Sequence, residues 1–375
     1  MYDLHAHLLP GIDDGAKNWE EAIALLEQAV EDGIQGIVCT PHQLGEEPMV
    51  NPDSLIKPMV AELKLRAVQR RLPIAIYSGG EVRCTPDVIE RMERGEAVCY
   101  EIIGEESWAA KESWAAGAGG AGGASGVSGA DGASGVDGAS GADGAGGAGG
   151  AGGSKNRGEK QRYLLLEMPY MEVPPYAAQV VFDLMVRGIR PIIAHPERNE
   201  GFAKQPELLR ELIEAGALVQ ITATSLSNRS PDSILELASL FLHHNMVHFM
   251  STDAHSPNRR PPYLARYRQK VENAMDKDIA RRLVVDVPGM ILAGKVIEAP
   301  PPQPFTAKSR HQANLLAKAF RQQQWRPHKS GSRSGSRSGS RSRSRSGSRS
   351  RRQVASSPAE VVRRWWYRLI GGGGR

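Results

Sequence analysis

The chain begins with MYDLHAHLLPGIDDG (residues 1–15), in which two histidines precede two aspartates by only a few residues. Residues 2–9 are rich in strand-forming types and are followed by Pro10-Gly11, which predicts a short strand and a turn. Side chains two residues apart on a strand share a face, so we expect His5 and His7 side by side, at a spacing that one metal ion can bridge. The alternative is a pair of hydrogen-bonded histidines on an inner strand, and the rest of the chain has to distinguish the two.

Apolar runs of this kind recur and alternate with helical patterns. Helical spacing of apolar residues covers residues 19–32, 53–71, 175–187 and 205–215, with strand-like runs such as GIVCTPH (36–42) and YLLLEMP (163–169) before or after them. This alternation predicts an α/β protein with a parallel sheet. The number of strand-like runs favours a closed or nearly closed barrel over an open sheet.

Histidines and carboxylates follow these apolar runs, at the strand ends where barrel active sites form. Besides His5 and His7 they are Asp14, His42, Glu81, Glu167, His195, Asp253 and His255. One such residue is usually a satisfied polar group or a helix cap, but nine in register are hard to explain without metal. Nitrogen and oxygen ligands in this number predict two or three ions. Because no thiolate belongs to the set, manganese, iron or zinc is expected rather than Cu(I) or an iron–sulfur cluster.

Clustered divalent ions lower the pKa of a bridging water and neutralise charge at phosphorus, which predicts phosphoester hydrolysis. Arg198 and Arg260 follow His195 and His255 closely and are candidates to hold phosphate oxygens. Cysteine phosphatases are excluded, because they need a cysteine at a fixed short spacing before an arginine. None of the three cysteines, Cys39, Cys84 and Cys99, has that spacing.

The motifs His-x-His, TPH, GGE, AHPER and TDAH, in this order, resemble the polymerase and histidinol phosphatase (PHP) superfamily. The longer pattern of DLHAHLLPGIDDGA, LLLEMP, AHPER and RPP resembles the manganese-dependent bacterial protein-tyrosine phosphatases of capsule and exopolysaccharide loci. The resemblance covers about residues 1–104 and 162–298 and implies a distorted (β/α)7 barrel with three metal ions.

The resemblance also implies a role for each residue. It implies three ligand groups, of which two share Glu81: His5, His7, Glu81 and Asp253; Glu81, Glu167 and His195; and Asp14, His42 and His255. In the Asp13-Asp14 pair, the family pattern favours Asp14 as the ligand. Arg198 and Arg260 would grip the phosphate, with His42 beside them at the reacting centre.

We therefore predict a metal-dependent tyrosine phosphatase whose substrate is a phosphotyrosine protein, a tyrosine kinase of polysaccharide export. One alternative keeps the metals and changes the substrate to a small phosphoester such as histidinol phosphate. A second alternative is a protein that binds nucleic acid or an anionic membrane surface through its C-terminal tail. The sequence gives no prediction of the oligomeric state.

We divide the chain into a barrel (residues 1–104 and 162–299), a Gly-rich insertion (105–161) and a tail (300–375). Glycine recurs at every third position from Gly117 to Gly153 without any proline, which disfavours a collagen helix and favours a flexible linker in a surface loop. The tail contains an Arg-Ser repeat without apolar residues and is expected to be disordered. Its last part, AEVVRRWWYRLI (359–370), suits a short basic amphipathic helix.

The charge is unevenly distributed. Residues 306–375 carry 18 Lys or Arg and one acid, a net charge of +17, so the rest of the chain carries −12 out of the total of +5. The acidic body fits a carboxylate-rich metal enzyme, and the basic tail predicts an anionic partner. No signal peptide or apolar membrane span is visible, and three cysteines do not form a disulfide framework. We expect a cytoplasmic protein, with a peripheral place at the membrane as the alternative.

Overall fold

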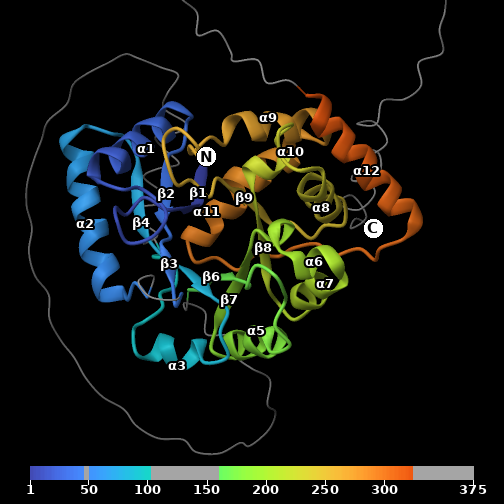
Figure 1. Cartoon of the computed structure of the whole chain (residues 1–375), viewed down its shortest axis with the longest axis horizontal. Helices are drawn as coiled ribbons and strands as arrows, with labels where there is room; N and C mark the ends of the chain where they lie inside the picture. The colour runs from blue at the N-terminus through green and yellow to red at the C-terminus, as the bar shows by residue number, and fades with distance from the viewer. Residues whose placement is uncertain (46–49, 103–159, 324–375) are drawn as a thin grey trace, which may run out of the picture.

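Strands and helices alternate along the computed structural model, which describes residues 1–45, 50–102 and 160–323 (Figure 1). The strands are β1 (Tyr2–Ala6), β2 (Gly36–Cys39), β3 (His42–Gln43), β4 (Ala75–Ser78), β5 (Glu81–Arg83), β6 (Arg162–Glu167), β7 (Ile189–Ala194), β8 (Leu218–Thr222) and β9 (Phe249–Ser251). The α-helices are α1 (Trp19–Glu31), α2 (Asp53–Gln69), α3 (Val88–Glu93), α5 (Ala177–Val186), α6 (Glu200–Lys204), α7 (Glu207–Glu214), α8 (Asp232–His243), α9 (Ala265–Ala274), α10 (Lys277–Arg281), α11 (Val287–Leu292) and α12 (Ala307–Gln322). Two short 3₁₀-helices are η1 (Pro196–Arg198) and η2 (Ala223–Leu226), and one π-helical turn is η3 (Arg282–Asp286).

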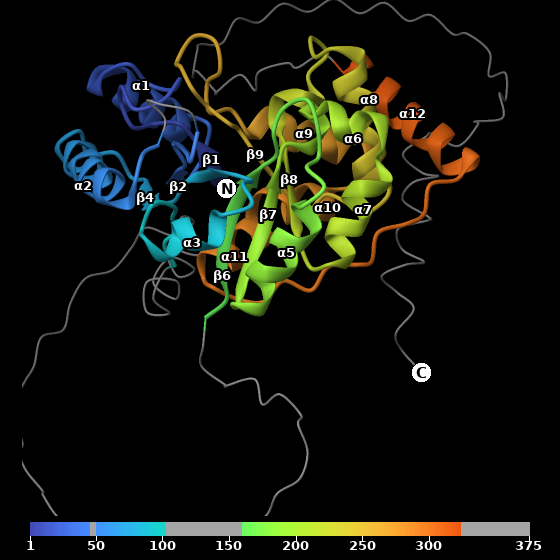
Figure 2. The ribbon, with the colours of Figure 1, turned by 60° about the horizontal axis from the view of Figure 1, so that its bottom comes forward.

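The strands form two parallel sheets, β1-β2-β4 and β3-β5-β6-β7-β8-β9. The predicted α/β class with a parallel sheet is confirmed. Helices α5, α6 and α7 lie beside β6, β7 and β8, as Figure 2 shows.

Two short interruptions separate strands that would otherwise continue from one sheet into the other. Pro41, which has no N–H to donate to a neighbouring strand, lies between β2 and β3. Gly79 and Gly80 lie between β4 and β5, and a Cβ on Gly80 would stand 1.9 Å from the side-chain oxygen of Gln43. These breaks make His42 and Glu81 the first residues of β3 and β5, where they are partners in register.

Strand β1 is bounded on one side by β2 and on the other by the residues that follow β9. The N–H of Asp253 donates to the carbonyl of His5 (2.8 Å), and the N–H of His7 donates to the carbonyl of Ala254 (2.8 Å). The beginning of the chain and the segment after β9 therefore lie side by side, and both carry predicted site residues.

Apolar side chains from both sheets meet in one buried cluster, which includes Tyr2, Leu4, Val38, Tyr77, Tyr163, Leu165, Ile192, Leu218 and Phe249. Two further clusters lie between the strands and the surrounding helices. Helix α1 shows how sequence leads to this packing: Asn18 caps it by accepting the N–H of Glu21, and its apolar positions are buried. Within residues 1–45, 50–102 and 160–323, no helix combines the length and apolarity that crossing a membrane requires.

The prediction that residues 300–375 form a disordered tail is wrong for the first part of this range. Residues 307–322 form α12, which packs against α8 and α9 and buries Ala313, Leu316, Ala317 and Phe320 (Figure 1). These residues follow the helical i, i+3, i+4, i+7 spacing, and Thr306 caps the helix in a capping box with Ser309. Because the predicted tail began at the Pro-rich segment, the amphipathic pattern that follows this segment was not predicted to be a helix. The Arg-Ser repeat, the basic aromatic segment and the Gly-rich insertion up to residue 159 lie outside the described residues.

Contacts at the end of α12 fix the helix to the rest of the chain. The buried Lys270 ammonium donates to the carbonyls of Phe320 and Leu226, both at 3.1 Å, and the Arg321 guanidinium pairs with the Asp232 carboxylate at the start of α8. We infer that α12 is part of the folded body rather than of the tail.

We predict that truncation after Phe305 lowers the melting temperature on the order of 5–10 °C, because it exposes the apolar surface that α12 covers. The matched control is truncation after Gln323, which keeps α12 and should leave the melting temperature of the full chain unchanged. Thermal unfolding followed by circular dichroism measures both. Equal melting temperatures of the two truncated chains would contradict this role of α12.

Candidate metal centre

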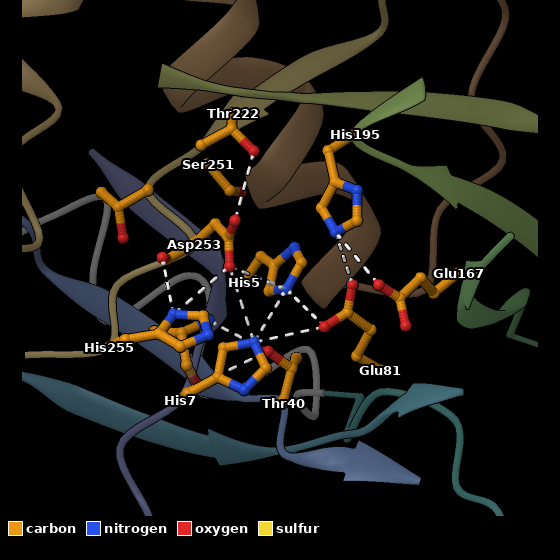
Figure 3. A network of polar contacts seen from close by, with 12 residues as sticks. His5, His7, Thr40, Glu81, Glu167, His195, Thr222, Ser251, Asp253 and His255 are labelled. Atoms are coloured by element: carbon orange, nitrogen blue, oxygen red, sulfur yellow. Dashed lines mark hydrogen bonds and ion pairs between the residues drawn. The ribbon is translucent and has the colours of Figure 1, made fainter. Parts of the chain in front are cut away.

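The structure brings all nine predicted ligand residues into one network of side chains, which come from β1, β3, β5, β6 and the segments that follow β1, β7 and β9. Figure 3 shows the part of this network formed by His5, His7, Glu81, Glu167, His195, Asp253 and His255. Three groups within it offer ligand atoms that lie within 4.8 Å of one another: His7, Asp14, His42 and His255; His5, His7 and Glu81; and His42, Glu81 and Glu167. Each group combines imidazole nitrogen with carboxylate oxygen, a donor set that suits divalent transition metals.

The Glu81 carboxylate lies at the centre of this network. Its Oε2 is 3.1 Å from Nε2 of His5 and 3.2 Å from both Nε2 of His7 and Nδ1 of His42. Its Oε1 contacts Nε2 of His195 at 2.7 Å. Despite these short distances, Oε2 is buried and makes no hydrogen bond of acceptable geometry with any described residue. A buried carboxylate oxygen faced by three imidazole nitrogens without a hydrogen bond fits a cation site.

The other carboxylates complete the network from different sides. Asp14 Oδ1 lies 3.1 Å from Nε2 of His255 and 3.5 Å from Nε2 of His42, and the Asp14 side chain is 60 % exposed. Asp253 Oδ1 lies 3.6 Å from Nε2 of His5 and of His7. The exposed Asp14 marks the side from which solvent and substrate can reach the cluster.

Glu167 lies at the end of β6, the strand next to β5. Its Oε2 is 3.6 Å from Nδ1 of His42, and its Oε1 is 3.9 Å from Nε2 of His195. Two of the site residues also have positive φ angles that side-chain-bearing residues rarely adopt, 29° for His195 and 54° for Asp253. Such conformations persist where the surrounding structure holds them, and they are concentrated at functional sites.

The pKa values of the site follow from burial and from the facing charges. Burial alone would raise the pKa of Glu81, but the His5 and His42 rings outweigh it and hold the pKa well below its usual range. Burial and the Glu81 charge together raise the pKa of Glu167. Burial opposes protonation of His195, yet Glu81 raises its pKa to about 9. The carboxylates thus stabilise positive charge on the imidazoles, and the same field favours a divalent cation.

Asp13 has a role that the sequence analysis did not assign. Its side chain is fully buried, and Oδ2 accepts from Nδ1 of His7 (2.8 Å) and from the N–H of His42 (3.2 Å). Burial would lower the pKa of His7, but the Asp13 charge raises it well above the usual value. Gly15 makes this arrangement fit, since its N–H donates to Asp13 and a Cβ there would stand 2.3 Å from the His7 carbonyl. Asp13 therefore orients the His7 ring so that Nε2 faces the cluster.

Gln220 on β8 does the same for the other histidine of the opening motif. Its Oε1 contacts Nδ1 of His5 at 3.0 Å, which leaves Nε2 of His5 facing Glu81. A further buried carboxylate, Asp3, accepts the N–H of Thr252 at 3.0 Å and the Thr252 hydroxyl, and burial raises the pKa of Asp3 to about 6. Asp3 thereby holds the segment that carries Asp253 against β1. The sequence signal for Asp13 was its place beside Asp14, whereas none marked Gln220 or Asp3.

The two predicted phosphate-binding arginines are in different surroundings. Arg260 forms an ion pair with the Asp253 carboxylate and so lies at the cluster itself. Arg198, in η1 three residues after His195, donates from Nη2 to the Thr224 hydroxyl on η2 at 2.9 Å. The structure therefore places Arg260 in contact with the network and Arg198 on the adjoining turn.

Parallel sheets with a cluster of histidines and carboxylates that could hold metal ions define the class of protein as an α/β protein with a candidate metal centre. The family described as "Capsular polysaccharide synthesis, CpsB/CapC" matches residues 1–102 and 153–293, and the chain belongs to this family. CapC of Staphylococcus aureus is 33 % identical over 261 residues, which cover 70 % of this chain and 79 % of CapC. Helix α12 lies beyond the matched residues.

Two more distant relatives are named tyrosine-protein phosphatases. YwqE of Bacillus subtilis is 24 % identical over 304 residues (81 % of this chain, 96 % of YwqE), and CpsB of Streptococcus agalactiae is 22 % identical over 302 residues (79 % and 100 %). A solved structure from a study of YwqE and of CpsB from Streptococcus pneumoniae, described there as metal-dependent tyrosine phosphatases, aligns with a TM-score of 0.62 at 23 % identity. It covers 82 % of this chain and all of the solved chain, so the fold is shared.

We predict that Asp13→Asn weakens the binding of Mn²⁺ to chelator-treated protein by roughly 10- to 100-fold, as loss of a carboxylate that orients a metal-binding histidine typically does. Isothermal titration calorimetry measures the affinity. The control is Asp183→Asn on α5, away from the cluster, which should bind as the parent chain does. Unchanged affinity in Asp13→Asn would show that Asp13 does not orient His7 for metal.

Proposed function

We propose that this protein is a metal-dependent phosphoric monoester hydrolase that removes phosphate from phosphotyrosine in proteins. The observation that carries the proposal is the Glu81 Oε2 atom, buried among three imidazole nitrogens without a hydrogen bond. The names of the CpsB and YwqE relatives support the tyrosine phosphatase activity. The donors in this chain fit the metal dependence described for the solved relatives.

We also infer that the two sheets together form a distorted (β/α)7 barrel. Strand β2 continues into the other sheet as β3, and β4 continues as β5, each after a break of two residues. The hydrogen bonds between β1 and residues 253–254 join the opposite edges. The shared apolar cluster then fills the interior, and the metal centre lies at one end.

The proposed ligands form three groups: His5, His7, Glu81 and Asp253; Glu81, Glu167 and His195; and Asp14, His42 and His255. Manganese is the proposed ion, and this set of nitrogen and oxygen donors also accepts iron or zinc. When bound, such ions lower the pKa of water to give a nucleophile and neutralise charge on the phosphoryl oxygens.

The other residues of the chain bind and orient. Asp13 and Gln220 fix the rings of His7 and His5, so the nitrogens that face Glu81 do not need to reorganise. Arg260 lies at the cluster and Arg198 on η1, and a planar guanidinium suits two phosphoryl oxygens. His42, 21 % exposed and in contact with Asp14 and Glu81, lies between the buried and the open part of the site.

Thiol chemistry does not fit this chain. Burial raises the pKa of Cys39, raises that of Cys84 to about 12 and raises that of Cys99 to about 11. A cysteine nucleophile requires a lowered pKa, because the thiolate is the reactive form. None of the three residues lies in the cluster that holds the candidate ligands.

The substrate that we propose is a tyrosine kinase of polysaccharide export, in agreement with the capsule family to which the chain belongs. Dephosphorylation would take place in the cytoplasm or at the inner membrane surface. Binding of the basic C-terminal tail to an anionic membrane or nucleic acid remains a proposal from sequence, since residues 324–375 lie outside the described part of the chain.

We predict that chelation abolishes hydrolysis of a phosphotyrosine peptide and that added Mn²⁺ restores it, because the carboxylates and imidazoles alone supply no nucleophile. Alkylation of thiols should leave the restored activity unchanged. Phosphate release measures both effects, and histidinol phosphate is assayed in parallel as the alternative substrate. Full activity of protein shown to be free of metal would contradict the proposal. Faster turnover of histidinol phosphate than of the peptide would indicate that the substrate is a small phosphoester.

We predict that Glu81→Gln loses more bound metal than Asp14→Asn, because Glu81 contributes to two of the proposed groups and Asp14 to one. Metal content per chain is measured by mass spectrometry after dialysis against Mn²⁺. Glu62→Gln on α2, an ordinary surface carboxylate, is the control and should retain the full content. Full occupancy in Glu81→Gln would exclude the proposed bridging role.

A further inference from the structure

The loop that follows β6 exposes two large side chains shortly after a proposed metal ligand. Tyr170 is 65 % exposed and Met171 is 58 % exposed. They are adjacent in sequence, and Tyr170 lies three positions after Glu167, a proposed ligand. We call these two residues the Tyr170–Met171 pair.

The backbone beneath the pair is held in place by several hydrogen bonds. The buried Asn199 side chain donates to the carbonyls of Pro169 (2.7 Å) and Glu172 (3.1 Å), on either side of the pair. The N–H of Glu200 donates to the carbonyl of Tyr170 (3.0 Å). The pair therefore sits on a loop fixed at its base rather than on a free one.

Close packing reinforces these hydrogen bonds. A Cβ on Gly201 would stand 2.5 Å from the N of Val173, so the loop and α6 approach as closely as glycine allows. Met168 before the pair is buried, and the Tyr176 hydroxyl after it donates to the Cys84 carbonyl at 3.3 Å. Both ends of the loop are thus anchored, while the two side chains between them remain in solvent.

The same contacts connect the backbone of the pair to two parts of the proposed site. Three Cα steps from Glu167 span at most about 11 Å. On the other side, the Tyr170 backbone is hydrogen-bonded to Glu200, two residues after Arg198. A residue within three positions of a phosphotyrosine is separated from it by at most the same span, so a peptide bound at the metal centre is long enough to reach the pair.

We propose that the Tyr170–Met171 pair is a specificity-determining surface that binds an apolar residue within three positions of the phosphotyrosine in a peptide substrate. Exposed apolar side chains on an anchored backbone suit such contact, because the backbone of the loop is already ordered before the peptide binds. The exposed Glu172 next to the pair disfavours an acidic residue at that position of the peptide. This inference rests on the proposed phosphatase function and adds the kind of substrate sequence that the site selects.

The test uses the full chain loaded with Mn²⁺ and three substrates: p-nitrophenyl phosphate and two phosphotyrosine peptides that differ only in having leucine or glycine beside the phosphotyrosine. The parent chain should prefer the leucine peptide in kcat/KM by roughly five- to twenty-fold, mainly through KM, as partial burial of two side chains predicts. In the double variant Tyr170→Ser/Met171→Ser this ratio between the two peptides should fall to about one.

The matched control is Phe182→Ser/Val186→Ser on α5, which removes two side chains of similar exposure (58 % and 68 %) away from the site and should keep the parent preference. An unchanged preference in the Tyr170–Met171 variant, or no preference in the parent chain, would overturn the inference while leaving the phosphatase intact. If the Mn²⁺-loaded parent hydrolyses none of the three substrates, the proposed function itself fails.

Discussion

The buried Glu81 carboxylate is the feature around which the rest of the site is arranged. Removing a carboxylate from water is unfavourable unless positive charge or hydrogen bonds compensate for it. Here the compensation comes from the imidazoles of His5 on β1, His42 on β3 and His195 in the turn after β7. The pKa values of His42 and His195 are raised despite burial. A site with this much negative charge is stabilised by any cation that fits it, which connects the fold directly to metal binding.

The strand breaks explain how the fold brings these groups together. Pro41 and the Gly79-Gly80 pair end two strands of one sheet and begin two of the other, so that His42 and Glu81 become neighbours in register. The close approach at Gly80 leaves no space for a side chain beside Gln43. Backbone shape at these positions thus decides which side chains meet at the centre.

Two features of the chain lie outside the ligand cluster. Helix α12 lies beyond the residues that the family matches, yet it is fixed by the buried Lys270 and by the Arg321–Asp232 ion pair. The Tyr170–Met171 pair belongs to the matched part and remains exposed on an anchored loop. Helix α12 packs against the body of the protein, whereas the pair offers the exposed surface that we propose for contact with a substrate peptide.

The sequence alone determined what depends on local periodicity. The two-residue repeat of a strand places His5 and His7 on one face, and the alternation of strands and helices predicts parallel strands whose ends carry the other ligands. Because parallel strands end at one edge, those residues were expected together, and the structure brings them together. The chain order of the motifs was also sufficient to suggest the family.

Only the tertiary structure decided which groups support the ligands. Gln220 contacts His5 across 215 positions of the chain, and Asp3 contacts Thr252 across 249, so no local pattern could connect them. Asp13 and Asp14 are neighbours of identical chemistry, yet in the folded chain Asp13 contacts His7 and the N–H of Gly15, whereas Asp14 contacts His255. Helix α12 was not predicted although its amphipathic pattern is local. Its burial depends on α8 and α9, which only the folded chain places beside it.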